Sequence, residues 1–213
     1  ENLPFYGHIF LNLDDLNIRK ISKDIHRRQI TFGFNSKNRF QITDAKLESG
    51  LQKFQLIDHN NKKQYKFSTN LSGRHNLYNV TAAICVAIEE NISIKDIAKG
   101  LANFRGVGRR FELSEIYFSN HPHVLIDDYG HHPAEILSTI LAAKEKFPRQ
   151  KICMIFEPHR FTRTQQLFDD FKKVLSRVDF LLLLDIYPAS EKPIKGISSK
   201  KLASEILKNH KNV

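Results

Sequence analysis

The sequence predicts an α/β fold built from two units. In the second half, three short apolar runs at 124–127, 151–156 and 180–185 are each followed by a longer amphipathic stretch. Runs of that length are typical of buried strands, and strands that alternate with helices form a parallel sheet with right-handed crossovers. In the first half, short strand-like segments separated by polar turns precede two helices. We therefore expect a strand-rich unit followed by a parallel-sheet unit.

Five segments of the first half have the composition and length of strands. Polar turns separate them, and the turn at 59–63 is typical of a hairpin loop because it joins two strand-like segments directly. The five predicted strands are Ile9–Leu13, Gln29–Phe34, Phe40–Ala45, Gln52–Asp58 and Gln64–Ser68.

Two helices are predicted after these strands. The motif GRHNLYN at 73–79 opens the first helix, with Asn76 as the expected N-cap. The second helix begins after Ser93, which forms a capping box with Asp96, and it runs to about Phe104. The glycine-containing stretch FRGVGRRF that follows predicts a linker between the units. The expected apolar face of the first helix consists of Tyr78, Ala82, Ala83, Val86 and Ala87.

Three further helices are predicted in the second half, one after each apolar run. The first covers 133–147, since Pro133 suits the first turn of a helix that starts after His132. The second covers 165–178 and the third 199–209, each with a stripe of apolar residues at helical spacing.

Polar clusters directly follow the three apolar runs. They read DDYGHHP at 127–133, EPHRFTR at 157–163 and DIYPASE at 185–191. If the runs are parallel strands of one sheet, all three clusters lie at its carboxyl edge, where open α/β sheets bind ligands. Arginines at that edge suit carboxylates or phosphates, although pairing of one arginine with a neighbouring acid would equally tie down a loop.

Composition and charge exclude several classes of protein. The chain is 41% hydrophobic and 26% charged, which is typical of a globular protein, and no apolar run reaches the ~20 residues of a membrane span. The formal net charge is +10, yet the lysines are scattered and few aromatic residues accompany them. We expect neither a membrane nor a nucleic-acid partner, and the oligomeric state stays open.

The two cysteines and ten histidines show no metal-ligand spacing. Cys85 and Cys153 are too few for a disulfide framework, so we expect buried, reduced thiols in a cytoplasmic protein. No metal site is expected within this chain.

Four motifs together carry a family resemblance. GRHNLYN, GVGRRF, DDYGHHP and PHRFTRT, in this order, resemble the Mur ligases of peptidoglycan synthesis, and the similarity extends from about Asn2 to Ala189. The resemblance implies that residues 1–109 are the carboxyl-terminal part of a central ATP-binding domain with a mixed sheet. It implies that residues 110–213 are a Rossmann-like, amino-acid-binding domain that is incomplete at its end.

The activity implied by the resemblance is ATP-dependent amide ligation. L-alanine would be joined to the carboxylate of UDP-N-acetylmuramate through an acyl phosphate, with ATP and Mg²⁺ as cofactors. The phosphate-binding loop, the main magnesium ligands and the UDP-binding domain are expected before position 1, so the isolated chain is expected to be inactive. Two alternatives stay open: a sister ligase that recycles a tripeptide, and a non-catalytic nucleotide- or sugar-binding remnant.

The resemblance also implies roles for ten residues. The nucleotide contacts would be made by His75, Asn76, Asn79, Arg110 and Asp128. Because these residues belong to both domains, closure about the 104–111 linker is expected to assemble the site. The amino-acid and acyl end of the site would be lined by Tyr129, His131, His159, Arg160 and Arg163. Arg160 and Arg163 would bind a carboxylate or an oxyanion, with the two histidines beside them. The alternative is that these residues have purely structural roles: the asparagines would cap a helix, Arg110 would be a surface residue and Asp128 would form a turn.

Overall fold

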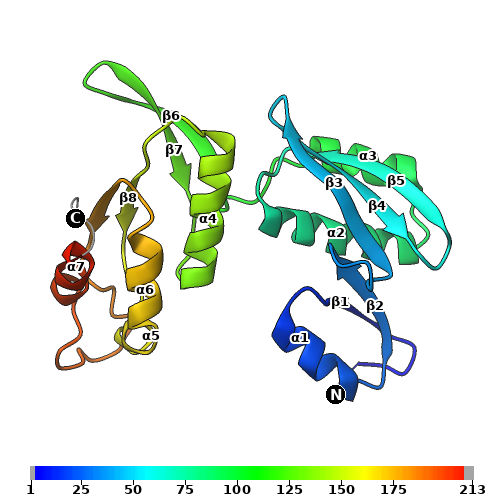
Figure 1. Cartoon of the computed structure of the whole chain (residues 1–213), viewed down its shortest axis with the longest axis horizontal. Helices are drawn as coiled ribbons and strands as arrows, with labels where there is room; N and C mark the ends of the chain where they lie inside the picture. Colours follow the sequence, from blue (N-terminus) through cyan, green and yellow to red (C-terminus); the bar gives the residue numbers. More distant parts are fainter. Residues whose placement is uncertain (1–2, 209–213) are drawn as a thin grey trace. The chain divides into compact units, whose positions relative to one another are not determined.

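The computed structural model describes residues 3–208 and confirms the predicted α/β class (Figure 1). The chain divides into two compact units, which comprise residues 1–106 and 107–213. Each unit has its own cluster of buried apolar side chains. The boundary falls within the glycine-containing stretch 104–111.

The first unit is built on a mixed sheet of five strands in the order β1-β2-β3-β4-β5. The first three strands are parallel, and the remaining pairings are antiparallel. All five predicted strands are confirmed, with ends that differ by up to three residues. Their bounds are β1 His8–Asn12, β2 Arg28–Gly33, β3 Phe40–Glu48, β4 Leu51–Asp58 and β5 Lys63–Thr69.

The antiparallel part of this sheet shows the alternation expected of strands with one buried face. On β4 every second residue is buried, from Gln52 through Phe54 and Leu56 to Asp58. The hairpin with β5 pairs Asp58 with Lys63, which confirms the predicted turn at 59–63. One face of β4 therefore faces the core while its other face carries partly exposed side chains.

Helices pack on this sheet and complete the core of the first unit. Helix α2 (Arg74–Glu89) contacts β1 and β2, and α3 (Ile94–Asn103) contacts β5. The Ser93 hydroxyl accepts a hydrogen bond from the Asp96 amide at 3.2 Å, which confirms the predicted cap. Helix α1 (Leu16–Ile21) and the short 3-10 turn that follows it were not predicted, although Asp15 caps α1 through two backbone amides.

Two details predicted for α2 are wrong. The helix starts one turn earlier than expected, so Gly73 rather than Asn76 is its N-cap; Gly73 has φ +94°, a conformation that a residue without a side chain adopts easily. The buried face is also rotated, because Ala83 and Val86 are exposed. The buried residues follow the i, i+3, i+4, i+7 spacing of a helix face: Leu77, Val80, Thr81, Ile84 and Cys85.

The second unit combines a β-hairpin, a pair of parallel strands and four helices among its described residues (Figure 1). The hairpin pairs β6 with β7 in antiparallel fashion, and β8 pairs with β9 in parallel. The predicted helix at 133–147 is confirmed as α4, and the one at 199–209 as α7, although Asn209 lies outside the described residues. The elements are β6 Glu112–Phe118, β7 His121–Asp127, α4 Pro133–Lys146, β8 Cys153–Phe156, α5 Phe161–Gln166, α6 Phe168–Leu175, β9 Phe180–Leu183 and α7 Ser199–Leu207.

The prediction of one parallel sheet for all three apolar runs is therefore wrong in one part. The runs in β8 and β9 are parallel neighbours, as predicted, but the run at 124–127 pairs with β6. A tight turn makes that pairing possible, since Ser119 and Asn120 both have positive φ, as a type I′ hairpin turn requires. The predicted helix at 165–178 is also corrected to two shorter helices, α5 and α6, that join at Leu167.

Apolar side chains from α4, α6, α7 and the two parallel strands form the core of the second unit. Phe171, Leu175, Leu202 and Ile206 are fully buried in it. Cys153 is exposed, contrary to the prediction of two buried thiols, because alternate residues of β8 point away from this core. Burial of Cys85 is confirmed.

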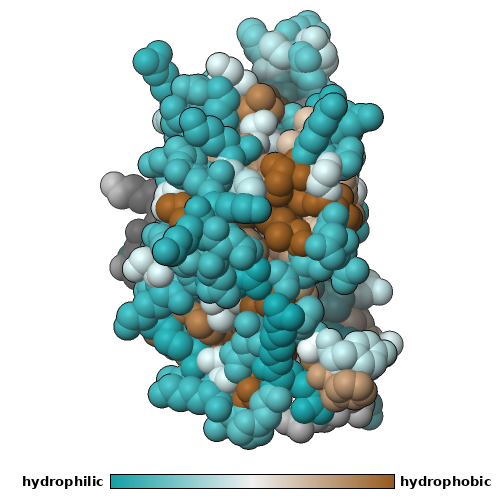
Figure 2. Space-filling model, turned by 90° about the vertical axis from the view of Figure 1, so that its right-hand side faces the viewer, coloured by the Kyte–Doolittle hydropathy of each residue, from teal (hydrophilic) through white to brown (hydrophobic). Residues whose placement is uncertain are grey.

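On the face shown in Figure 2 hydrophilic residues predominate, and hydrophobic residues form one larger area and a few small ones. Within residues 3–208, the helices all fall short of the length and apolar character that crossing a bilayer requires.

Candidate active site

The loops that follow β7, β8 and β9 meet in the second unit and bring four rings into a row. Tyr129 lies against His131 with ring centroids 5.5 Å apart, and His131 lies 6.0 Å from His159. Tyr187 stacks on His159, with ring centroids 5.3 Å apart and an interplanar angle of 27°. We call these four residues the ring row. The three polar clusters seen in the sequence therefore converge, although the strand of the first one pairs differently from expectation.

The loop after β7 is held by the carboxylate of Asp128. One of its oxygens accepts a hydrogen bond from the Phe111 amide at 2.9 Å, and the other accepts from the Gly130 amide at 2.8 Å. A Cβ atom at position 130 would lie 2.7 Å from Asp128 Oδ1, so a larger residue there would force the carboxylate to move. Asp128 thus fixes the path of the backbone that carries Tyr129 and His131.

Arg109 supports Tyr129 and was missed by the sequence analysis. Its guanidinium carbon lies 5.0 Å from the centroid of the Tyr129 ring, and its Nε lies 3.5 Å from Asp127 Oδ2. Its carbonyl oxygen accepts a hydrogen bond from the Tyr129 amide at 2.8 Å. The motif GVGRRF contains two adjacent arginines, and it could have indicated Arg109 as well, but only Arg110 was predicted to be a site residue. Arg110 itself is exposed.

His131 and His132 have different environments. Nδ1 of His131 lies 3.1 Å from the Tyr129 carbonyl oxygen, and that contact places the histidine ring within the ring row. His132 caps α4 by accepting a hydrogen bond from the Ala134 amide, and Glu135 completes the capping box by accepting from both histidine amides. Pro133 follows at the first helical position, as predicted. His132 therefore serves the helix, while His131 faces the site.

The loop after β8 presents His159 with two arginines. Arg163 Nη1 lies 3.5 Å from His159 Nδ1 and 3.4 Å from the His159 carbonyl oxygen. Arg160 is exposed, and within residues 3–208 its guanidinium has no hydrogen bond or ion pair. The alternative in which Arg160 or Arg163 merely pairs with Glu157 or Asp169 is not observed. Positive charge therefore gathers beside the ring row.

Burial lowers the pKa of His159 below its ordinary value of 6.5, and the positive charges of Arg163 and Arg160 lower it further. The imidazole is therefore mainly neutral at pH 7. A neutral ring beside two guanidinium groups can exchange a hydrogen bond with a substrate without adding a third positive charge to the site.

The predicted nucleotide residues of the first unit lie on the first turns of α2. The side-chain amide of Asn76 donates a hydrogen bond to the Ser72 carbonyl oxygen at 2.8 Å, inside the turn before the helix. Asn79 is exposed one turn later, with its Nδ2 3.5 Å from Asn76 Oδ1. His75 is partly buried beside them. The three residues thus share one end of α2.

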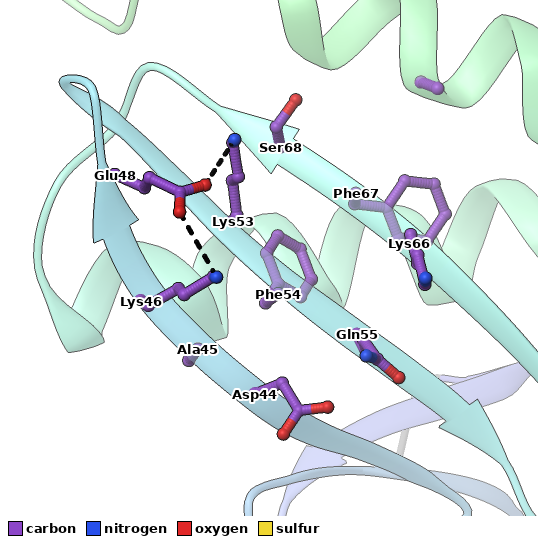
Figure 3. Close-up of a pocket in the computed structure, with 11 residues that line it drawn as sticks. Asp44, Ala45, Lys46, Glu48, Lys53, Phe54, Gln55, Lys66, Phe67 and Ser68 are labelled. Atoms are coloured by element: carbon purple, nitrogen blue, oxygen red, sulfur yellow. Dashed lines mark hydrogen bonds and ion pairs between the residues drawn. The ribbon is translucent and has the colours of Figure 1, made fainter.

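A separate hollow of about 800 Å³ lies on the sheet of the first unit (Figure 3). Lys46, Lys53, Lys66 and Glu48 contribute to its polar lining. Two of the lysines are paired with Glu48, at 3.3 Å from Lys46 and 2.5 Å from Lys53, as Figure 3 shows. None of the ten predicted site residues lines this hollow, so it is not the site indicated by the motifs.

Metal ligands do not cluster in the part of the chain that the structure describes: residues 3–208 contain no group of three or more His, Cys, Asp or Glu side chains placed to hold an ion.

The chain matches known protein families along nearly its whole length. Residues 1–87 match the Mur ligase middle domain, and residues 109–213 match the Mur ligase glutamate ligase domain. It is 44% identical over 212 residues to the UDP-N-acetylmuramate--L-alanine ligase of Baumannia cicadellinicola subsp. Homalodisca coagulata, covering 97% of this chain and 43% of that protein. It is 43% identical over 218 residues to the ligase of the same name from Buchnera aphidicola subsp. Baizongia pistaciae, covering 100% of this chain and 45% of that protein. The chain therefore spans less than half the length of these curated relatives.

Solved structures agree with these matches. The UDP-N-acetylmuramate-alanine ligase MurC of Thermotoga maritima superposes with a TM-score of 0.69 and 26% identity, covering 86% of this chain and 38% of that one. The MurF ligase of the same organism, solved in complex with ADP, has a TM-score of 0.68 at 17% identity, covering 95% of this chain and 42% of that one, and so shows the fold alone. Both family matches and both folds point the same way, and the chain belongs to the Mur ligase family.

Proposed function

We propose that the full-length protein containing this chain joins L-alanine to the carboxylate of UDP-N-acetylmuramate, with ATP as the energy source. The observation that carries the proposal is the 41–44% identity, over at least 97% of the chain, to relatives named UDP-N-acetylmuramate--L-alanine ligase. Because the chain spans less than half the length of those relatives, the activity is assigned to the complete protein and not to the isolated chain.

The proposed reaction has two balanced steps. A carboxylate oxygen of the sugar nucleotide attacks the γ-phosphorus of ATP, and ADP leaves. The amine of L-alanine then attacks the activated carbonyl carbon, and phosphate leaves as the amide forms and the amine loses a proton. Such a reaction depends on positioning and on charge stabilisation more than on an unusual nucleophile.

Each unit, taken by itself, offers side chains suited to contacts with a nucleotide. Asn79 is exposed and offers both an amide donor and an acceptor, as an adenine edge requires, with Asn76 and His75 beside it. Arg110 is an exposed guanidinium suited to phosphate oxygens, and Asp128 keeps acceptor capacity for a ribose hydroxyl while it holds its loop. For magnesium, the described residues contain no group of three or more His, Cys, Asp or Glu side chains, so no residue of this chain is proposed as its ligand.

Arg160 and Arg163 are proposed to hold the carboxylate of the amino acid. Arg160 has an uncommitted guanidinium, and Arg163 keeps donors beyond its contacts with His159. A planar guanidinium matches a carboxylate through two parallel hydrogen bonds. Tyr129, backed by Arg109, stands beside His131 and would restrict the space for a side chain. This arrangement favours a small amino acid such as L-alanine.

The two histidines are proposed to have complementary proton roles. A carbonyl oxygen only accepts, so the His131 contact with the Tyr129 carbonyl places the ring proton on Nδ1 and leaves Nε2 as an acceptor for the amine proton. In His159 the arginine donor at Nδ1 places the proton on Nε2, which can donate to a developing oxyanion. His131 is thus the base and His159 the donor in the proposed site.

The experiment that tests the proposal is ADP release by the full-length protein with ATP, magnesium and UDP-N-acetylmuramate. Turnover with L-alanine supports the proposal. Turnover only with the L-alanyl-γ-D-glutamyl-meso-diaminopimelate tripeptide would assign the recycling reaction instead, and no turnover with either would leave a binding remnant. The cytoplasmic location expected from the sequence belongs to the same proposal.

Variants separate the two ends of the site. Arg160→Ala is expected to lower kcat/KM for L-alanine about 100-fold, by analogy with the loss of one charge-stabilising donor. Asn79→Ala is expected to raise the KM for ATP with less effect on L-alanine. Arg149→Ala, an exposed arginine of the same unit, is the control and should leave all constants unchanged.

A further inference from the structure

Tyr187 is the one member of the ring row to which neither the motifs nor the proposed function gives a role. It lies in the loop after β9, within the polar cluster DIYPASE. We propose that Tyr187 is a positioning residue for the amino-acid end of the site, because its ring and its backbone fix the orientation of His159. This inference rests on the proposed function for its catalytic consequence, but its structural part can be tested by itself.

The backbone of Tyr187 forms hydrogen bonds with the residues immediately before and after His159. Its amide donates a hydrogen bond to the Pro158 carbonyl oxygen at 2.8 Å, and its carbonyl oxygen accepts from the Arg160 amide, also at 2.8 Å. These two bonds form a parallel bridge between His159 and Tyr187 outside the regular strands. The residues before and after His159 are therefore held by one residue of another loop.

The side chain of Tyr187 covers one face of the His159 imidazole. The two ring centroids lie 5.3 Å apart with an interplanar angle of 27°, and the His131 centroid lies 6.0 Å from that of His159. Arg163 contacts the His159 ring at Nδ1. With one face stacked and one nitrogen bonded, the ring has little freedom to rotate, so the direction of Nε2 is fixed.

The two loops are joined a second time, beyond the ring row. Glu191 accepts hydrogen bonds from the Thr162 amide at 3.0 Å and from the Thr162 hydroxyl at 2.6 Å. Between these attachments Arg160 has φ +75°, and Ala189 and Ser190 also have positive φ. Residues with side chains keep such a conformation only where the surroundings enforce it. The loop after β9 thus holds the strained loop that presents His159 and Arg160.

Tyr187 is suited to positioning and not to core packing. It is 51% exposed, so the second unit does not depend on it for burial. The contact that matters is the stacked ring, which phenylalanine would preserve and leucine would remove. This difference separates a positioning role from chemistry by the hydroxyl group and from a general loss of folding.

The test uses the full-length protein with Tyr187→Phe and Tyr187→Leu, and with Tyr117→Leu as a control for removal of an exposed tyrosine from the same unit. Kinetic constants are measured for L-alanine, ATP and the sugar nucleotide. We expect Tyr187→Leu to lower kcat/KM for L-alanine at least about tenfold, because small displacements of a reacting group are costly, with the KM of the other two substrates unchanged. Tyr187→Phe and Tyr117→Leu should stay within about twofold of the unsubstituted protein.

A second readout does not depend on activity. The imidazole nitrogen signals of His159, assigned by NMR with a His159→Gln variant, should shift in Tyr187→Leu and stay in place in Tyr187→Phe. The inference is overturned if those signals do not move, if the phenylalanine variant loses as much activity as the leucine variant, or if all three KM values change together. If the unsubstituted protein turns over no L-alanine, the proposed function fails, and the NMR comparison alone then decides whether Tyr187 orients His159.

Discussion

The hydroxyl of Tyr78 on α2 donates a hydrogen bond to the carboxylate of Asp14, just beyond β1, at 2.9 Å. The same carboxylate accepts from the amides of Phe34 and Asn35, after β2, and from the side chain of Asn38 at 3.2 Å. A single acidic side chain thus joins the ends of two parallel strands to the helix that carries the predicted nucleotide residues.

Replacing Asp14 with alanine is expected to lower the free energy of unfolding by about 2–4 kcal/mol, because several donors lose a charged acceptor at once. Urea denaturation measures this loss. The neighbouring Asp15→Ala removes only the cap of α1 and should cost about 1 kcal/mol. Equal losses for the two variants would contradict the central role of Asp14.

The pH dependence of stability should report the same carboxylate. Burial raises the pKa of Asp14, but the hydrogen bonds from Phe34, Asn35, Tyr78 and Asn38 outweigh it and hold the pKa below its ordinary value of 3.8. A group with a depressed folded-state pKa stabilises the protein fully above its unfolded pKa, and that stabilisation is lost as the pH falls through the folded pKa. The stability difference between the unsubstituted protein and Asp14→Asn, measured by urea denaturation, should therefore be constant near neutral pH and shrink below about pH 4. If the difference in unfolding free energy between the two proteins stayed constant down to pH 2, this explanation would be wrong.

Arg39 anchors a buried ion-pair network in the first unit. Its guanidinium lies 2.7 Å from Glu89 and 3.4 Å from Asp58, and the three side chains are only 14%, 9% and 0% exposed. Arg39→Met should cost about 3–5 kcal/mol in unfolding free energy, because it removes the cation that lies between two buried carboxylates. Arg28 also pairs with Glu89 but is 64% exposed, so Arg28→Met should cost about 0–1 kcal/mol. Similar costs in thermal or urea unfolding would argue against a buried network.

The two thiols should differ in reactivity. Cys153 is exposed, whereas Cys85 is buried and burial raises the pKa of its thiol far above the ordinary value. A thiol reagent should therefore label Cys153 rapidly in the folded chain and reach Cys85 only after denaturation. Cys153→Ser should abolish the rapid phase, and any rapid labelling left in that variant would show that Cys85 is accessible.

Local sequence patterns were sufficient where a residue's own neighbours decide its structure. The alternation along β4 and the Ser93–Asp96 cap follow from short-range spacing, and both are found in the structure. The start of α2 was misplaced because Asn76 is a good cap by composition, while the glycine three residues earlier adopts the positive φ that begins the helix.

Contacts between distant segments were beyond the reach of these patterns. The strand β6 is exposed along its whole length, so its sequence lacks the alternation that would have predicted it. Because β6 pairs with the run at 124–127, that run does not join the expected parallel sheet. Tyr187 was visible only as part of a polar cluster, since nothing local shows that its ring stacks on His159. The ten residues taken from the family motifs keep their predicted roles as proposals, and five of them lie together around the ring row.

The contact between Asp128 and Gly130 couples the effects of mutations at the two positions. An alanine at position 130 would meet the carboxylate while Asp128 is present, and it would meet Glu135 Cβ at 3.3 Å as well. To make room, Asp128 would have to turn away and give up the hydrogen bonds that it accepts from the Phe111 and Gly130 amides. In a randomised library of this loop, the preference for glycine at position 130 should therefore be strongest among survivors that keep aspartate at position 128.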